Sequence, residues 1–253
     1  MEAYTDFAEV YDVFMDQTPY GEWCDRLIHT LDKYRVEKGL VLDLGCGTGT
    51  LTELLAGAGY DMIGVDNSEA MLNVAMEKRN RSGSDILYLL QDMREFELYG
   101  TVAAVVSICD CINYLLKEEE LIETFRLVNT YLDPGGLFIF DFNTVYKYAQ
   151  VIGEQTIAEN RENCSFIWEN YYHEKRQINE YDLTVFVQNK DGLFQRFREN
   201  HYQRGYTLAR IKGCLEEAGM EFVEAFDEEE GKPVSKTSER IYCVAREKGK
   251  KKP

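Results

Sequence analysis

The sequence predicts an α/β fold in which short buried strands alternate with helices, with an antiparallel β-sheet inserted late in the chain. Apolar runs that end in acidic or glycine-rich turns recur over residues 41–141, and segments with helical periodicity separate them. Residues 144–206 instead alternate polar and aromatic side chains, which is typical of antiparallel strands with one solvated face. The 253 residues are enough for one large core with an insertion.

The most specific motif is a glycine-rich turn that follows the first predicted strand. Residues 41–50 read VLDLGCGTGT, so Asp43 precedes glycines at Gly45, Gly47 and Gly49, with Cys46 among them. Glycine lets the backbone approach a flat ligand at low steric cost. The spacing is G-x-G-x-G rather than the G-x-G-x-x-G of dinucleotide-binding proteins, so NAD is disfavoured.

Two further predicted strands end in carboxylates. Asp66 closes the apolar run 61–66, and Asp92 closes the run 86–92. An ionised carboxylate has two acceptor oxygens and no donor, so Asp66 can accept both hydroxyls of a ribose. Ser68 then follows as a suitable N-cap for a helix that contains Met71.

This order of motifs resembles the class I S-adenosylmethionine-dependent methyltransferases, and the L-x-P-G-G run at 132–136 resembles the turn before their fifth strand. The resemblance implies a Rossmann-like seven-stranded mixed sheet that binds S-adenosyl-L-methionine and releases S-adenosyl-L-homocysteine. It also implies a cofactor-binding core over residues 1–143 and 207–253, with residues 144–206 as an inserted antiparallel β lid.

The resemblance further implies which residues bind the cofactor. Tyr11 stands in an F-A-x-x-Y-D segment whose tyrosine reaches the cofactor in this family, and an aromatic face attracts a sulfonium cation. Tyr4 is a weaker candidate of the same kind. Asp92 is expected to accept from the adenine amino group while Met93 packs on the ring. The complete expected set is Tyr11, Asp43, Gly45, Cys46, Gly47, Gly49, Asp66, Asn67, Met71, Asp92, Met93 and Cys109.

The insertion is expected to cover the methyl acceptor. Residues 166–173, 181–188 and 193–202 are predicted strands, and residues 189–192 form a turn between the last two. An insertion after the fifth strand lies at the carboxyl ends of the parallel strands, where ligands bind in open α/β sheets. The alternative interpretation is a dimerisation surface, and one element can serve both purposes.

Three residues are candidates for positioning the acceptor or removing its proton. His201 lies at the end of the insertion, and histidine is the residue type best suited to act as a base near neutral pH. Asp110 and Asn113 follow the fourth strand together with Tyr114. The alternatives are a structural histidine and a strand-end cap. Because a sulfonium methyl is already activated, the protein mainly needs to align the nucleophile and exclude water. The seven cysteines show no metal-binding spacing, so no metal is expected.

Composition narrows the class of acceptor. A net charge of −17 disfavours nucleic acid, because such binding depends on lysine and arginine contacts to phosphates. The scattered cysteines, an acidic N-terminus and short apolar runs favour a cytoplasmic protein that does not enter a membrane. The sequence therefore predicts methyl transfer to a nitrogen or oxygen of a small molecule. An RNA or protein methyltransferase on the same core, or a non-catalytic S-adenosylmethionine-binding module, remain the alternatives.

Overall fold

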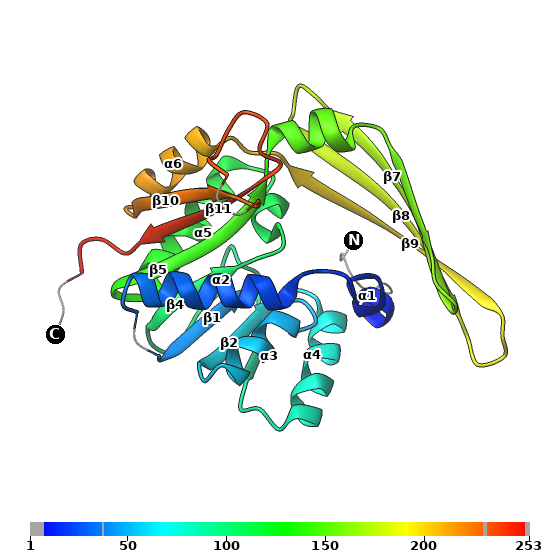
Figure 1. Cartoon of the computed structure of the whole chain (residues 1–253), viewed down its shortest axis with the longest axis horizontal. Coiled ribbons are helices and arrows are strands. Elements are labelled where there is room, and N and C mark those ends of the chain that lie inside the picture. Colours follow the sequence, from blue (N-terminus) through cyan, green and yellow to red (C-terminus); the bar gives the residue numbers. More distant parts are fainter. Residues whose placement is uncertain (1–7, 37, 230–231, 251–253) are drawn as a thin grey trace.

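The computed structural model describes residues 8–36, 38–229 and 232–250, and this part of the chain contains two separate β-sheets (Figure 1). The large sheet has seven strands in the order β10-β11-β5-β4-β1-β2-β3, and the small sheet has four in the order β6-β7-β8-β9. The strands of the large sheet are β1 Leu40–Leu44, β2 Asp61–Asp66, β3 Leu87–Leu90, β4 Val102–Ser107, β5 Leu132–Asn143, β10 Glu221–Asp227 and β11 Arg240–Arg246.

The large sheet has the mixed topology that the sequence predicts. Strands β1 to β5 pair in parallel, whereas β11 runs antiparallel to both β5 and β10. The carboxyl ends of the five parallel strands therefore meet at one edge, and the glycine turn after Leu44 and the carboxylate of Asp66 both lie there. The predicted seven-stranded fold is confirmed.

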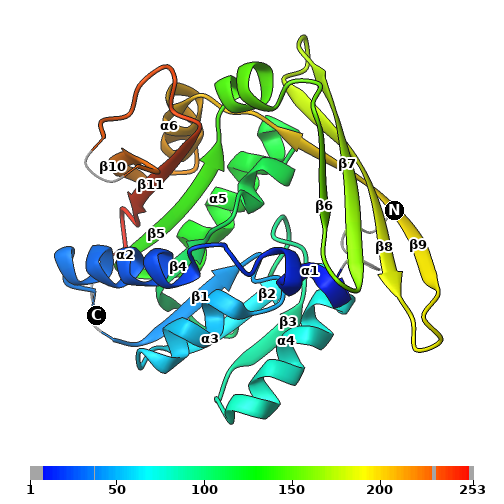
Figure 2. The same ribbon diagram turned by 45° about the vertical axis from the view of Figure 1, so that its right-hand side comes forward.

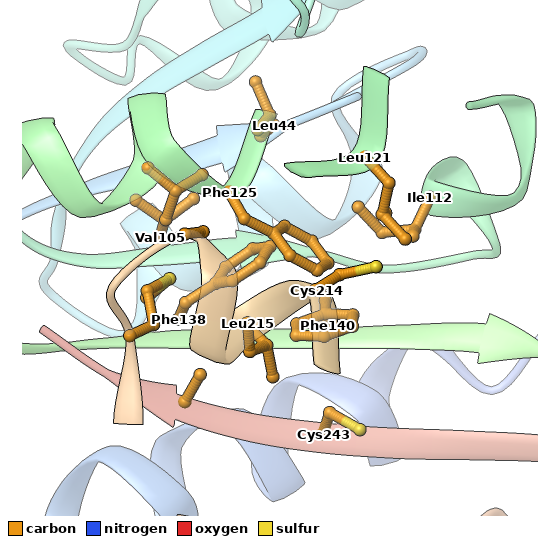
Figure 3. Close-up of a cluster of buried hydrophobic side chains, with 14 of the residues drawn as sticks. Leu44, Val105, Ile112, Leu121, Phe125, Phe138, Phe140, Cys214, Leu215 and Cys243 are labelled. Atoms are coloured by element: carbon orange, nitrogen blue, oxygen red, sulfur yellow. The ribbon is translucent and has the colours of Figure 1, made fainter. Parts of the chain in front are cut away.

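Helices cover both faces of this sheet. The bounds are α1 Ala8–Phe14, α2 Tyr20–Lys33, α3 Thr50–Gly57, α4 Glu69–Ser82, α5 Glu118–Tyr131 and α6 Leu208–Glu217, with the 3₁₀ turn η1 Cys111–Tyr114 and the π-helix η2 Lys147–Ile152. Alternate residues of β5 face opposite layers: Leu137 and Ile139 pack with α2 and α3, while Phe138 and Phe140 pack with α5 and α6. Figure 3 shows the second cluster, in which the Phe138 and Phe140 rings stack with centroids 4.4 Å apart.

The insertion forms the small sheet from β6 Thr156–Asn160, β7 Cys164–His173, β8 Ile178–Gln188 and β9 Phe194–Arg204. Three of these strands match the predicted ones, and β6 was not predicted because its five residues lack a buried alternating face. Both views place this sheet beyond the carboxyl ends of the parallel strands, with α1 between the two sheets (Figures 1 and 2).

Strand β5 starts earlier than the sequence predicts. The expected strand began after the L-x-P-G-G run, but Leu132 already pairs with Val102 of β4. The pairing register then shifts between Val102 and Ala104, which accommodates the intervening turn residues.

Helix α1 bridges the two sheets. Its Phe14 ring contacts Phe166 of β7 edge to face with centroids 4.9 Å apart, and Val10 packs in the same cluster as Leu183. The candidate Tyr4 and the first residue of the F-A-x-x-Y-D segment lie outside the described residues. No helix in the described part of the chain has the length and apolar character to cross a membrane.

Candidate active site

A cavity of about 240 Å³ lies over the glycine turn, at the carboxyl ends of β1, β2, β3 and β4. It brings together Tyr11, Asp43, Gly45, Cys46, Gly47, Asp66, Asn67, Met71, Asp92, Met93 and Cys109. Of the expected cofactor residues, Gly49 does not line it. Gly49 is the N-cap of α3 with φ of +74°, and an added Cβ would lie 2.4 Å from the Tyr88 hydroxyl. Its role is therefore to shape the turn.

Asp66 is held by the backbone of the glycine turn. Its Oδ2 accepts a hydrogen bond from Gly47 N at 2.8 Å, and its Oδ1 accepts one from Ser68 N at 2.9 Å. Burial raises the pKa of Asp66, and these backbone donors oppose that shift. Each oxygen keeps a second acceptor position, so the carboxylate can still bind the two hydroxyls of a ribose.

The other two acids of the cavity have different environments. Asp43 is buried, accepts a hydrogen bond from Thr52 Oγ1 at 2.7 Å, and has its pKa raised to about 7, chiefly by burial. The Asp92 carboxylate accepts from Arg94 Nε at 2.9 Å, and this side-chain hydrogen bond lowers the pKa of Asp92. Asp92 is therefore a fixed anion in the lining of the cavity, where an exocyclic amine could donate to it.

Helix α1 is tied to the glycine turn through Asp12. The Asp12 carboxylate accepts from Thr48 Oγ1 at 2.7 Å and forms an ion pair with Lys78 of α4 at 2.6 Å. Lys78 also donates to Thr50 Oγ1 at 2.6 Å. These contacts place the neighbouring residue of α1, Tyr11, against the cavity.

A second cavity of about 480 Å³ lies between α1, η1 and the inserted sheet. It shares Tyr11, Trp23, Cys109 and Tyr114 with the first cavity. Its remaining lining residues are Phe14, Met15, Gln17, Thr18, Pro19, Asp110, Glu159, Phe166, Trp168, Tyr181, Leu183, His201, Gln203 and Arg240. The two predicted residues His201 and Asp110 thus lie in a cavity that adjoins the first one.

The junction between the cavities has an unusual backbone. Cys109 and Asp110 have positive φ values of +72° and +53°, a conformation that non-glycine residues adopt at a cost. The backbone N–H of Asp110 donates to Asp141 Oδ1 at 2.9 Å, which holds this turn after β4.

Asp110 belongs to a buried network of ionic and polar groups. Its Oδ1 accepts from Arg240 at 2.7 Å and its Oδ2 accepts from Gln203 Nε2 at 2.7 Å. Arg240 also pairs with the fully buried Asp141. Burial raises the pKa of Asp141, and the charge of Arg240 opposes that shift. Gln203 in turn accepts from the Tyr148 hydroxyl at 2.7 Å. Asp110 is therefore fixed in place with one face toward the cavity.

Asn113 occupies a structural position. Its Nδ2 donates to the carbonyl oxygens of Asn143 at 2.9 Å and Arg204 at 2.7 Å, and its Oδ1 accepts from Asn143 N at 2.8 Å. The side chain is fully buried and lines neither cavity. The amide of Asn113 thus holds the backbone of β5 and β9, and the structure does not bring Asn113 together with His201 and Asp110 in the second cavity.

Sequence reasoning missed three polar residues of this region: Arg240, Gln203 and Glu199. Glu199 is buried, and its Oε2 lies 3.1 Å from His201 Nε2. Residues 199, 201 and 203 alternate along β9 and therefore share one face of the strand. This spacing around His201 is a sequence signal that could have identified Glu199 and Gln203. Arg240 carries no such signal, because its partner Asp110 is 130 residues away in the chain.

Comparisons with known proteins identify the class. Residues 41–136 match the family model described as "Methyltransferase domain". The chain is 35% identical over 243 residues to the "Putative methyltransferase YqeM" of Bacillus subtilis (strain 168), covering 96% of each protein. It is 30% identical over 138 residues to a dTDP-3-amino-3,4,6-trideoxy-alpha-D-glucopyranose N,N-dimethyltransferase of Streptomyces venezuelae, covering 54% of this chain and 56% of that protein.

One solved structure has the same fold over nearly the whole chain. The S-adenosylmethionine-dependent methyltransferase from Clostridium acetobutylicum ATCC 824 superposes with a TM-score of 0.88 at 28% identity, over 98% of this chain and all of the other. The chain belongs to the class I S-adenosylmethionine-dependent methyltransferases. Membership of this family confirms the predicted enzyme class and the predicted cofactor, S-adenosylmethionine.

Proposed function

We propose that this enzyme transfers the methyl group of S-adenosylmethionine to a nitrogen or oxygen of a small molecule held beneath the inserted sheet. The observation that carries the proposal is the pair of adjoining cavities, which share Tyr11, Trp23, Cys109 and Tyr114. A donor in one cavity and an acceptor in the other would meet at these residues. An in-line displacement requires such an arrangement of two ligands.

The first cavity suits the cofactor chemically. Asp66 would accept the ribose hydroxyls, Asp92 the adenine amine, and Tyr11 would present its ring to the sulfonium. S-Adenosylmethionine, when bound, supplies an electrophilic methyl group on a cationic sulfur. The residues of the chain supply orientation and the exclusion of water.

The charges of the second cavity favour an acceptor whose reacting end is an amine or a hydroxyl. Asp110 and Glu159 line it, and Arg240 is its only lysine or arginine among the described residues. Arg240 is already paired with Asp110 and Asp141. An acidic reacting end would therefore meet carboxylates without an uncommitted cation, which is costly in a buried site.

The size and the aromatic lining of this cavity support a small organic acceptor. A volume of about 480 Å³ lies in the range of small-molecule sites, and the rings of Phe166, Trp168 and Tyr181 form its walls. The Streptomyces venezuelae relative is named for dimethylation of an amino sugar, which supports an amine in particular.

The first test is isothermal calorimetry with S-adenosylmethionine and S-adenosylhomocysteine. Micromolar binding of both is expected, and the absence of binding would overturn the assignment of the first cavity.

The second test separates the classes of acceptor. The enzyme is incubated with S-adenosylmethionine that carries a tritiated methyl group and with three fractions of a bacterial extract: small metabolites, RNA and protein. Label is expected in the metabolite fraction. Label found only in RNA or in protein would refute the small-molecule proposal, and cofactor binding without transfer to any fraction would support a binding module instead.

A further inference from the structure

One wall of the second cavity is a connected set of polar and aromatic side chains. Asp110, Gln203, Tyr181 and Trp168 all line this cavity. Gln203 Nε2 donates to Asp110 Oδ2 at 2.7 Å, and Gln203 Oε1 accepts from the Tyr181 hydroxyl at 2.5 Å. The rings of Trp168 and Tyr181 pack edge to face with centroids 4.8 Å apart. A carboxylate and two aromatic rings therefore belong to the same wall.

The partners of Gln203 fix the orientation of its amide. The hydroxyls of Tyr148 and Tyr181 approach Oε1 at 2.7 Å and 2.5 Å, and the Asp110 carboxylate approaches Nε2. The reverse orientation would place Oε1 against the carboxylate, where neither oxygen can donate. Gln203 is 2% exposed, so this amide is held inside the protein with its donor toward Asp110.

Asp110 has room to accept further hydrogen bonds from the cavity. Within the described residues, its Oδ1 accepts from Arg240 at 2.7 Å and its Oδ2 accepts from Gln203. A carboxylate oxygen has two acceptor positions, so one position remains on each oxygen. The side chain of Asp110 is 18% exposed, which leaves part of the carboxylate accessible from the cavity that it lines.

The charge of Asp110 is incompletely neutralised by its surroundings. Arg240 pairs not only with Asp110 but also with Asp141 and, at 3.5 Å, with Glu228. Lys147 interacts electrostatically with Asp110, but it lies outside both cavities. Together these groups comprise three carboxylates and two cations, so the wall favours a cationic ligand.

A carboxylate beside aromatic rings suits a protonated amine, because the ammonium group donates to the carboxylate and its charge is attracted to ring faces. We propose that the second cavity takes an amine as its methyl acceptor, that Asp110 determines this specificity by pairing with the ammonium group, and that Gln203 is the positioning residue that holds Asp110. This inference rests on the proposed function and narrows the reacting atom to an amine nitrogen.

The charge on the acceptor is the same before and after transfer. The bound ammonium first releases one proton to water. The neutral nitrogen then forms its bond to the methyl carbon, while the carbon–sulfur bond breaks and leaves its electron pair on sulfur. The product is again an ammonium ion, which Asp110 can pair with as it paired with the acceptor.

The first arm of the test uses the wild-type enzyme. The small-metabolite fraction is incubated with S-adenosylmethionine that carries a tritiated methyl group, and the labelled product is isolated. Tandem mass spectrometry then locates the new methyl group. We expect it on nitrogen, and a methyl group on oxygen would overturn the amine specificity.

The second arm measures transfer over a dilution series of the same fraction, which gives an apparent KM for the acceptor. Asp110→Asn should raise this KM roughly tenfold and change kcat less than about threefold, because it removes charge from binding. Asparagine also tolerates the positive φ of +53° at this position. Gln203→Met removes the donor to Asp110 and should raise the apparent KM roughly threefold, at unchanged S-adenosylhomocysteine affinity.

The inserted sheet offers a matched control. Asp182 neighbours Tyr181 on β8 and also pairs with an arginine, because it accepts from Arg198 Nε at 2.8 Å. Successive residues of a strand point to opposite faces, and Asp182 lines neither cavity. Asp182→Asn should therefore keep the wild-type KM.

A wild-type KM in Asp110→Asn, or equal changes in Asp110→Asn and Asp182→Asn, would overturn the assignment of Asp110. A Gln203→Met enzyme that loses kcat and S-adenosylhomocysteine affinity at unchanged KM would overturn the positioning role of Gln203. Failure of the proposed function would look different, because the wild-type protein itself would then bind no cofactor or label no metabolite.

Discussion

Asp66→Ala removes the carboxylate on which the cofactor assignment depends most. Each oxygen of Asp66 already accepts one backbone hydrogen bond, from Gly47 N at 2.8 Å and from Ser68 N at 2.9 Å, and keeps one position for a ribose hydroxyl. Two hydrogen bonds to a charged group stabilise binding by about 3–6 kcal/mol together. The buried carboxylate also pays a desolvation cost, shown by its raised pKa, and the alanine variant is relieved of it. We therefore expect a net loss of about 3 kcal/mol, or roughly 100-fold in affinity.

Calorimetric titration with S-adenosylhomocysteine measures this loss, and thermal unfolding shows whether the variant stays folded. Asp61→Ala is the matched control, because Asp61 is an exposed acid at the start of the same strand β2 and lies outside both cavities. The control should bind as the wild type does. A folded Asp66→Ala protein with wild-type affinity would refute the placement of the ribose.

Three further predictions test the surroundings of the site. Asp12→Ala should weaken S-adenosylhomocysteine binding by roughly tenfold, since it breaks the ion pair that ties α1 to α4 and the hydrogen bond to the glycine turn; unchanged calorimetric affinity would contradict this. Burial raises the pKa of Asp43 from 3.8 to about 7, so the native state holds the Asp43 proton more tightly than the unfolded state does. The free energy of unfolding should therefore fall by up to about 4 kcal/mol as pH rises through that interval. Asp43→Asn should flatten the dependence of urea unfolding on pH, and an unaltered slope would exclude Asp43 as its source. Gly45→Ala should destabilise more than Gly47→Ala in denaturant titrations, because both have positive φ but only the Gly45 Cβ meets Cys111 Sγ, at 2.7 Å; equal losses would show that backbone strain alone matters.

The cofactor side of the site was predictable because its signals are local. Asp43, Asp66 and Asp92 each stand near the end of an apolar run, and parallel strands bring such ends to one edge of a sheet. The glycine turn is likewise determined by consecutive residues, and its backbone conformation follows from the presence of glycine. Eleven of the twelve expected residues line one cavity for this reason, although cofactor binding by each of them stays a prediction.

The acceptor side was less predictable because its contacts are distant in sequence. Arg240 meets Asp110 across 130 positions, and Asn113 meets the carbonyl of Arg204 across 91. Nothing near Asn113 distinguishes an amide that will serve a backbone from one that will face a ligand. His201 was found by its residue type alone, and its partner Glu199 became visible only when the alternation along β9 was combined with the fold.

Helix α1 gives the two cavities a common wall, and this has a consequence for how they are filled. Tyr11 lines both, Phe14 packs on Phe166 of the inserted sheet, and Asp12 is anchored to the glycine turn. A displacement of α1 would therefore open both cavities together. Any ligand that stabilises the docked helix lowers the cost of forming the other site, so binding of the cofactor and of the acceptor should be mutually favourable. If the two cavities hold the cofactor and the acceptor as proposed, the same seven-residue helix would help to align both reactants and to exclude water between them.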